Sequence, residues 1–395
     1  MPDSGYKADV QFLKAHADIV QLTGPDGARA AVAPGYQGRV MTSTLGDGRD
    51  RGFGWINRPF IEAGRQDETF NNYGGEDRFW LGPEAGQFGL WFRKGQPFDL
   101  AHWKTPAGLN RGPFKVAEAG RSGITMTRQM ELANYSGTTF RCSVRRTIRM
   151  LTGVEAAACM GVEPPAGVSM AAFESANTLT NAGQNPWTPD AGLLSLWILG
   201  MFKPLPRGQV IVPFCFGDPA TLGPAATTDY FGPVPPSRCT VTDDHVLFAC
   251  DGRFRGKIGI SRPRAKDVLG SFDPDGGVLT VVQFNKPRVA ARLPYVNSLW
   301  KIQKDPFAGD VVNSYNDGEA APGAGQLGPF YELETSSPAA DLAPQASLTH
   351  IHRTCHYAGA FDELNFLAKR ILGIDLTTGR KIPSTKPKIA PTFVG

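Results

Sequence analysis

Glutamates and histidines are concentrated in one short stretch near the end of the chain. Residues 330–357 contain two glutamates and three of the six histidines of the protein: Glu332, Glu334, His350, His352 and His356. Alternate side chains of a strand point to the same face, so the two glutamates would share one face and the three histidines another. Carboxylates and imidazoles that lie close together can transfer protons, the carboxylate as a base and the histidine as an acid.

The same residues allow two other interpretations. A His-x-His pair on a strand is a frequent metal-binding arrangement, so His350 and His352 could hold a divalent ion such as zinc, with His356 as a further ligand. Alternatively, the stretch is a polar strand face on which Arg353 pairs with Glu332. The residue types alone leave acid–base chemistry, metal binding and a structural role open.

A second segment, residues 71–92, combines glycines with tryptophans and charged side chains. Glycines allow tight bends, and aromatic faces beside carboxylates and an arginine form the kind of surface that sugars bind. Glu76, Arg78 and Trp80 are therefore predicted to contact a substrate. The alternative is a turn-rich hairpin with core tryptophans and a surface ion pair.

Two further segments supply amide side chains. Residues 173–202 carry Asn181 and Trp187, and residues 309–318 carry Asn313. Amides both donate and accept hydrogen bonds, and a tryptophan offers a stacking surface, so these residues are also candidates for substrate binding. Asn-rich turns are common, however, and structure alone would explain most of this pattern.

Strands are the elements that must position these residues. Glycine (46) and proline (32) make up about a fifth of the 395 residues, and strand-like runs recur between turn signals. Residues 140–150 alternate only partly between polar and apolar, which predicts a half-buried strand with an irregularity. Helical patterns are few, and the apolar stripe within 361–374 predicts a helix that packs on a sheet. We expect an all-β fold of large antiparallel sheets, one domain over 1–380, and an extended Pro/Lys-rich tail over 381–395.

The charge and hydropathy exclude several classes of partner. The chain has 41 basic and 37 acidic residues, a formal charge of +4, and we expect no nucleic-acid partner. The densest basic run, residues 255–266, alternates with apolar residues and is interpreted as a solvated strand face. No window is apolar enough to span a membrane, and the first twenty residues lack a signal-peptide pattern. We expect a soluble protein, cytoplasmic as the chain stands, or periplasmic or secreted if a signal peptide has been removed; the oligomeric state is not predicted.

Several motifs, in this order, resemble those of the galactose mutarotase-like superfamily, specifically a bacterial branch of it. The segment "VAPGYQGRVMTSTLGDG" (32–48) is similar to the opening strand pair of that superfamily. The segment "ELETSSPAADLAPQASLT" (332–349) is similar to the late strand that carries the catalytic glutamate of aldose 1-epimerases. The resemblance covers nearly the whole chain. It implies a β-supersandwich, an isomerase activity on a sugar that requires no cofactor, and Glu334 as the catalytic base.

The resemblance fails at the catalytic acid. Aldose 1-epimerases of this type carry a histidine after a Thr-Asn pair in mid-chain, whereas here Ala182 follows Asn181. We expect His350, His352 or His102 to take that role. Asn181, Trp187 and Arg78 are expected to line the same pocket.

Three functions remain open from the sequence. The first is an aldose 1-epimerase-like enzyme that acts on a sugar or sugar derivative through Glu334 and a histidine. The second is a metal-assisted saccharide lyase or hydrolase that uses His350 and His352. The third is a carbohydrate-binding protein without catalysis. In each, the partner is a small or oligomeric carbohydrate, and fold alone does not decide among them.

Overall fold

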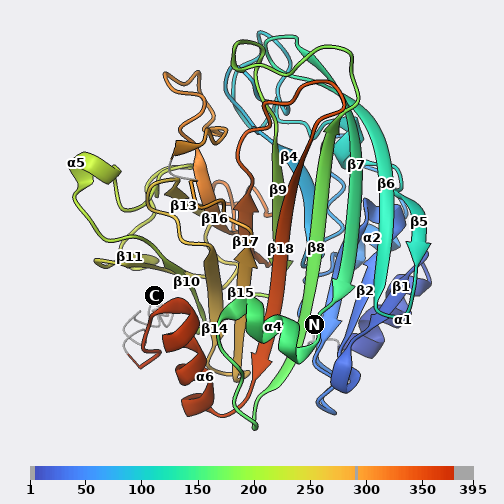
Figure 1. Cartoon of the computed structure of the whole chain (residues 1–395), viewed down its shortest axis with the longest axis vertical. Helices are drawn as coiled ribbons and strands as arrows, with labels where there is room; N and C mark the ends of the chain where they lie inside the picture. Colours follow the sequence, from blue (N-terminus) through green and yellow to red (C-terminus); the bar gives the residue numbers. More distant parts are fainter. Residues whose placement is uncertain (1–4, 290–291, 378–395) are drawn as a thin grey trace, which may run out of the picture.

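The computed structural model describes residues 5–289 and 292–377. Within these ranges the chain forms three antiparallel sheets and a few short helices (Figure 1). The prediction of an all-β fold built from large antiparallel sheets is therefore confirmed. The prediction of a single domain over 1–380 stays a prediction, and the tail over 381–395 lies outside the described residues.

The largest sheet has ten strands in the order β11-β12-β10-β14-β15-β18-β8-β7-β6-β5. Their bounds, in that order, are Cys239–Val241, His245–Ala249, Gln209–Pro213, Val268–Asp273, Val278–Phe284, Ser347–Ala358, Ser169–Asn181, Thr139–Met150, Gly123–Ala133 and Lys115–Ala119. The long strands β18, β8, β7 and β6 run side by side through the middle of the molecule (Figure 1). The predicted strand near the end of the chain is thus β18, which pairs with β8 and β15.

A five-stranded sheet lies behind the first in the view of Figure 1, in the order β13-β16-β17-β9-β4. Its strands are Gly256–Ser261, Asp310–Asn316, Tyr331–Ser336, Ser195–Phe202 and Arg78–Gly82. The central strand β17 carries Glu332 and Glu334, and pairs with β16 and β9. This central position fixes both glutamates on a backbone that is hydrogen-bonded on its two sides.

The third sheet and the helices complete the molecule. The sheet consists of β1 Val20–Thr23, β2 Arg29–Ala33 and β3 Arg39–Thr44. The α-helices are α1 Tyr6–Lys14, α2 Arg58–Glu62, α3 Ala107–Asn110, α4 Gly153–Met160, α5 Pro219–Leu222 and α6 Phe361–Leu367. The predicted C-terminal helix is α6, which continues as a π-helical turn to Leu372 and buries Leu364 and Leu367 in a cluster with residues of the ten-stranded sheet. No helix among the described residues is long and apolar enough to cross a membrane.

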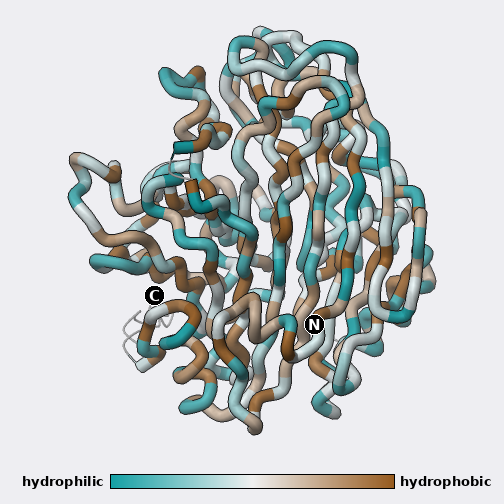
Figure 2. Tube along the Cα trace, in the orientation of Figure 1, coloured by the Kyte–Doolittle hydropathy of each residue, from teal (hydrophilic) through white to brown (hydrophobic). Residues whose placement is uncertain are grey.

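The two large sheets enclose a core that contains charged residues as well as hydrophobic ones. Figure 2 shows hydrophobic and hydrophilic residues interspersed along the strands of the ten-stranded sheet. Strand β7 has a regular antiparallel register with β6, so the irregularity predicted for residues 140–150 is absent. The inward position between Val144 and Ile148 belongs to Arg146, which is fully buried. An arginine in an apolar row disturbs the sequence pattern but not the strand.

Candidate functional site

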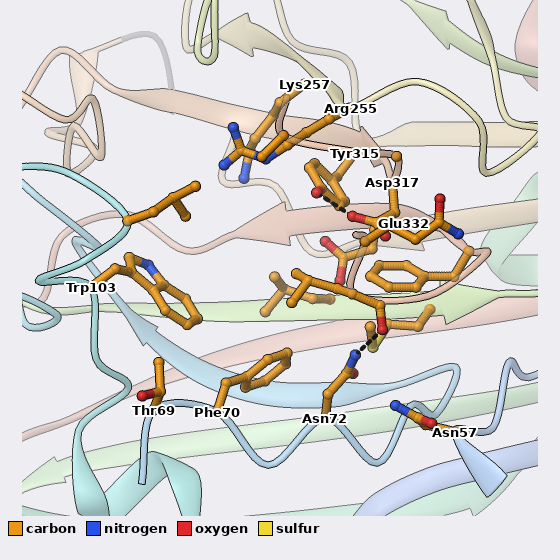
Figure 3. A pocket seen from close by; sticks show the side chains of 18 of the residues that line it. Asn57, Thr69, Phe70, Asn72, Trp103, Arg255, Lys257, Tyr315, Asp317 and Glu332 are labelled. Atoms are coloured by element: carbon orange, nitrogen blue, oxygen red, sulfur yellow. Dashed lines mark hydrogen bonds between the residues drawn. The ribbon is translucent and has the colours of Figure 1, made fainter. Parts of the chain in front are cut away.

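A cavity of about 530 Å³, the aromatic-lined cavity, opens on the face of the five-stranded sheet from which Glu332 projects. Figure 3 shows side chains that line it. This volume is typical of small-molecule sites. Its aromatic lining is Phe60, Phe70, Trp80, Trp103, Trp197, Phe231, Trp300, Tyr315 and Phe330. Its charged lining is Arg65, Asp67, Arg78, Glu84, Arg255, Lys257, Asp317 and Glu332.

The period of two along each strand decides which residues reach this cavity. Glu332 and Glu334 project from one face of β17, and Thr335 projects from the other. Glu332 lines the cavity directly. Glu334 is fully buried and lies beneath two lining residues, since its Oε2 accepts hydrogen bonds of 2.9 Å from both Trp197 Nε1 and Lys257 Nζ.

Two ion pairs join the charged residues of the cavity floor. Arg78 Nη2 donates to Glu332 Oε1 at 2.8 Å, and the Arg78 guanidinium lies 3.9 Å from the centre of the Trp80 ring. Lys257 pairs with Glu334, and its ammonium lies 4.7 Å from the centre of the Trp197 ring. Each cation therefore contacts a carboxylate and an aromatic face, and these contacts fix its position.

The surroundings shift the pKa values of these groups. Burial raises the pKa of Glu332 to about 8; the Arg78 charge opposes this shift and the Glu334 charge adds to it. Burial alone would lower the pKa of Lys257, but the charges of Glu334 and Glu84 outweigh it and raise that pKa. The balance of burial and neighbouring charges thus raises the pKa values of both Glu332 and Lys257.

Two more carboxyl groups of the cavity have a raised pKa, again mainly because of burial. Glu84 Oε1 accepts a hydrogen bond of 2.6 Å from Trp103 Nε1. Asp317 accepts from the Tyr315 hydroxyl at 2.5 Å and from the Gly328 backbone at 2.8 Å. Figure 3 shows Trp103 and Phe70 on one side of the cavity, and Tyr315 with Asp317 on another.

The glycines of the segment 71–92 have a backbone role beside this site. Gly74 has a φ of 85°, and a Cβ there would lie 2.1 Å from the Trp55 carbonyl oxygen. The carbonyl of Gly74 accepts a hydrogen bond of 2.9 Å from Arg39. Glycine lets the chain pass close to Trp55 just before β4, and this positions Arg78 and Trp80 over the sheet.

The histidines of the C-terminal stretch lie between the two large sheets, away from the cavity. His350 Nε2 and His352 Nδ1 are 2.7 Å and 2.9 Å from the Thr335 hydroxyl, and both rings are buried. Burial lowers the pKa of His350 to about 3 and that of His352 to about 4. Because Thr335 and Glu334 point to opposite faces of β17, the structure does not bring Glu334 and these histidines together on one face.

His356 and Glu76 are also core residues. His356 Nε2 and Glu76 Oε2 are 2.8 Å apart, and the ring stacks on Phe53 with a centroid separation of 3.8 Å. The described residues include no group of three or more His, Cys, Asp or Glu side chains arranged to hold a metal ion. Nor does the pairing of Arg353 with Glu332 occur, because Arg353 donates to Glu174.

The other predicted substrate-binding residues are distributed over the molecule. His102 is partly exposed and pairs with Asp99 at 2.7 Å. Asn181 and Trp187 line a separate cavity of about 650 Å³ by the ends of β7 and β8. Asn313 is buried next to the cavity floor and donates to the Tyr230 hydroxyl at 3.0 Å. Arg78 and Trp80 are the members of the predicted set that line the aromatic-lined cavity on the five-stranded sheet, and the roles of all these residues stay predictions.

The sequence-based interpretation missed several lining residues. The run 255–266 was interpreted as a solvated face, and this is wrong for its first residues, because Arg255 and Lys257 line the cavity and Lys257 is only 6% exposed. Figure 3 shows both side chains reaching into it. The alternation of basic and apolar residues marks a two-faced strand, but it does not show whether the basic face meets water or a cavity. Trp103 was missed although it adjoins the predicted His102.

The chain is similar in structure to several solved proteins. They include the Slr1438 protein from Synechocystis sp. PCC 6803 (12% identity, 87% of this chain and 96% of that chain, TM-score 0.51). A second is a galactose mutarotase-like protein from Lactobacillus casei ATCC 334, with 11% identity over 86% of this chain and 100% of that chain and a TM-score of 0.48. A third is a galactose mutarotase related enzyme from Lactobacillus acidophilus, with 8% identity over 87% of this chain and 98% of that chain and a TM-score of 0.45. At these identities a structural likeness concerns the fold alone.

The sequence comparisons identify the family. A comparison with curated proteins found no match. The profile of DUF6786, described as a family of unknown function, matches residues 4–382. Because this match covers nearly all of the 395 residues, the chain belongs to the DUF6786 family.

Proposed function

We propose that the protein is an aldose 1-epimerase-like enzyme that opens and recloses the ring of a sugar bound in the aromatic-lined cavity. The observation that carries this proposal is the composition of the cavity. Flat aromatic faces lie on several of its sides, and Arg78, Lys257 and Glu332 converge on its floor. Sugars bind to such surfaces through ring stacking and planar hydrogen-bond partners.

Glu334 is the proposed base, as the resemblance to aldose 1-epimerases implies. Its Oε2 contacts Lys257 and Trp197, which both line the cavity. Its Oε1 is buried and has no hydrogen-bond partner among the described residues, which leaves an acceptor for a sugar hydroxyl or a water. A proton from the anomeric hydroxyl would pass to Glu334 directly, or through the ammonium of Lys257, which would accept one proton as it gives another to Glu334.

The test is proton NMR of anomer exchange, with a panel of hexoses, pentoses, uronic acids and disaccharides. We expect the wild-type protein to accelerate exchange of at least one sugar. Glu334→Gln should slow that exchange at least about 100-fold, since a positioned base contributes roughly 10²–10⁴-fold. Glu118→Gln, the same change at an exposed position on β5, is the matched control and should behave like wild type. No exchange with any sugar would refute the proposal.

The burial of Glu334 favours a second candidate, a carbohydrate-binding protein without catalysis. In that case a sugar would contact Arg78, Trp80 and Trp103, while Lys257 would keep Glu334 covered. Calorimetric titration separates the two functions. Binding without exchange, unchanged in Glu334→Gln, would identify the binding protein.

A further inference from the structure

We infer that Glu332 is the proton donor of the aromatic-lined cavity and the acid partner of Glu334. This inference rests on the proposed ring-opening reaction. It assigns to a residue of the same strand the role that a mid-chain histidine has in aldose 1-epimerases, where this chain has Ala182.

The position of Glu332 on β17 is the first argument. Glu332 and Glu334 are two residues apart on one strand and share one of its faces, so their Cα atoms are roughly 6.6 Å apart. Two carboxyl groups so placed can act on neighbouring atoms of one ligand. His350 and His352 contact Thr335, which projects from the opposite face of β17. The sheet itself therefore separates both histidines from the cavity.

The hydrogen bonds of Glu332 are the second argument. Oε1 accepts from Arg78 at 2.8 Å, and Arg78 is in turn held over the Trp80 ring. Among the described residues, this bond from Arg78 is the one that the Glu332 carboxyl group accepts, and Glu332 lines the cavity. One oxygen is thus anchored, while the other is available to carry a proton toward a ligand.

The other carboxyl groups that line the cavity are less suitable. Asp317 receives a hydroxyl and a backbone N–H. Glu84 receives the Trp103 indole N–H, and it lies outside β17, so it does not share a strand face with Glu334. Asp67 accepts from the backbone N–H groups of residues 69 and 70. Burial also raises the pKa of Glu332 to about 8, and an acid acts best when its pKa is near the working pH.

The proposed step is balanced in protons and electrons. The anomeric O–H proton goes to Glu334, and the bonding pair that it leaves forms the C1=O double bond. The C1–O5 bond breaks with its electron pair on O5, which takes the proton of Glu332. After rotation about C1–C2, O5 attacks the other face of C1, Glu332 recovers its proton from O5, and Glu334 returns its proton to the carbonyl oxygen.

The experiment combines the pH profile of anomer exchange with infrared titration of the carboxyl group. The proteins are wild type, Glu332→Gln and Glu118→Gln. We expect the rate of wild type and Glu118→Gln to fall above about pH 8, with a carboxyl C=O band that disappears over the same range. Glu332→Gln should lack that band, lose the basic limb of the profile and lose at least about 100-fold in kcat with a small change in KM.

The outcomes separate this inference from the proposed function. If wild type accelerates the exchange of no sugar, both the proposed function and the acid role of Glu332 are refuted. If wild type exchanges a sugar and Glu332→Gln does so at a similar rate with the same pH profile, only the acid role of Glu332 is refuted. A slow Glu332→Gln variant that keeps the basic limb and the band also overturns it, because the group that titrates is then another one. Glu332→Asp, which keeps the carboxyl group, should recover part of the rate.

Discussion

The two histidines that share the Thr335 hydroxyl should make the fold sensitive to acid. Both rings are buried, and their pKa values are lowered by burial to about 3 for His350 and about 4 for His352. In the unfolded chain each would titrate near its ordinary value of about 6.5. Between pH 6.5 and pH 4 the unfolded state therefore binds more protons than the folded state, so stability is present above pH 6.5 and is lost as the pH falls.

The size of the effect follows from linkage. One pKa unit corresponds to about 1.4 kcal/mol, and pH 5.0 is about 1.5 units below the unfolded pKa. Each histidine should therefore remove about 2 kcal/mol from the free energy of unfolding between pH 7.5 and pH 5.0. The pair should remove about 4 kcal/mol, a large fraction of the stability of a typical domain.

The assay is denaturant unfolding followed by tryptophan fluorescence at both pH values. We would compare wild type with His350→Gln and His352→Asn, which keep a polar group near the position of the nitrogen that contacts Thr335. Each variant should show a pH effect about 2 kcal/mol smaller than that of wild type. The raised pKa of Glu332 acts in the opposite direction, but it is common to all three proteins and cancels in the difference. An unchanged pH effect in both variants would refute the assignment of these histidines to a neutral, buried pair.

Two further predictions concern stability. Arg146→Met should lower the free energy of unfolding by roughly 3–5 kcal/mol, because it leaves the carboxylate of Asp77 buried without its partner. We expect a similar loss for Asp77→Asn. If denaturant unfolding shows no loss in either variant, the pairing is contradicted. Gly74→Ala should lower the melting temperature by more than Gly95→Ala does. Both glycines have a positive φ, but only at Gly74 would a Cβ also contact the Trp55 carbonyl. Equal effects of the two substitutions on the melting temperature would contradict this reasoning.

The sequence predicted the elements of the fold better than it predicted the site. Turn signals and alternation indicated antiparallel sheets, and the apolar stripe of residues 361–374 indicated the helix that packs on one of them. The prediction of an irregularity in residues 140–150 was wrong. It assumed that every inward residue of a strand is apolar. Arg146 is inward and charged, since Asp77 and the amide of Asn177 bind it inside the core.

The sequence by itself determined that Glu332 and Glu334 share one face of a strand and that the three histidines share one face of another, because this depends only on the period of two. Only the tertiary structure decided that these faces do not meet. Glu332 and Glu334 project from the face of β17 that borders the cavity. His350 and His352 contact Thr335 on the opposite face of the same strand. The same limit applies to Lys257, because the sequence of a strand contains no information about whether a neighbouring loop covers its polar face.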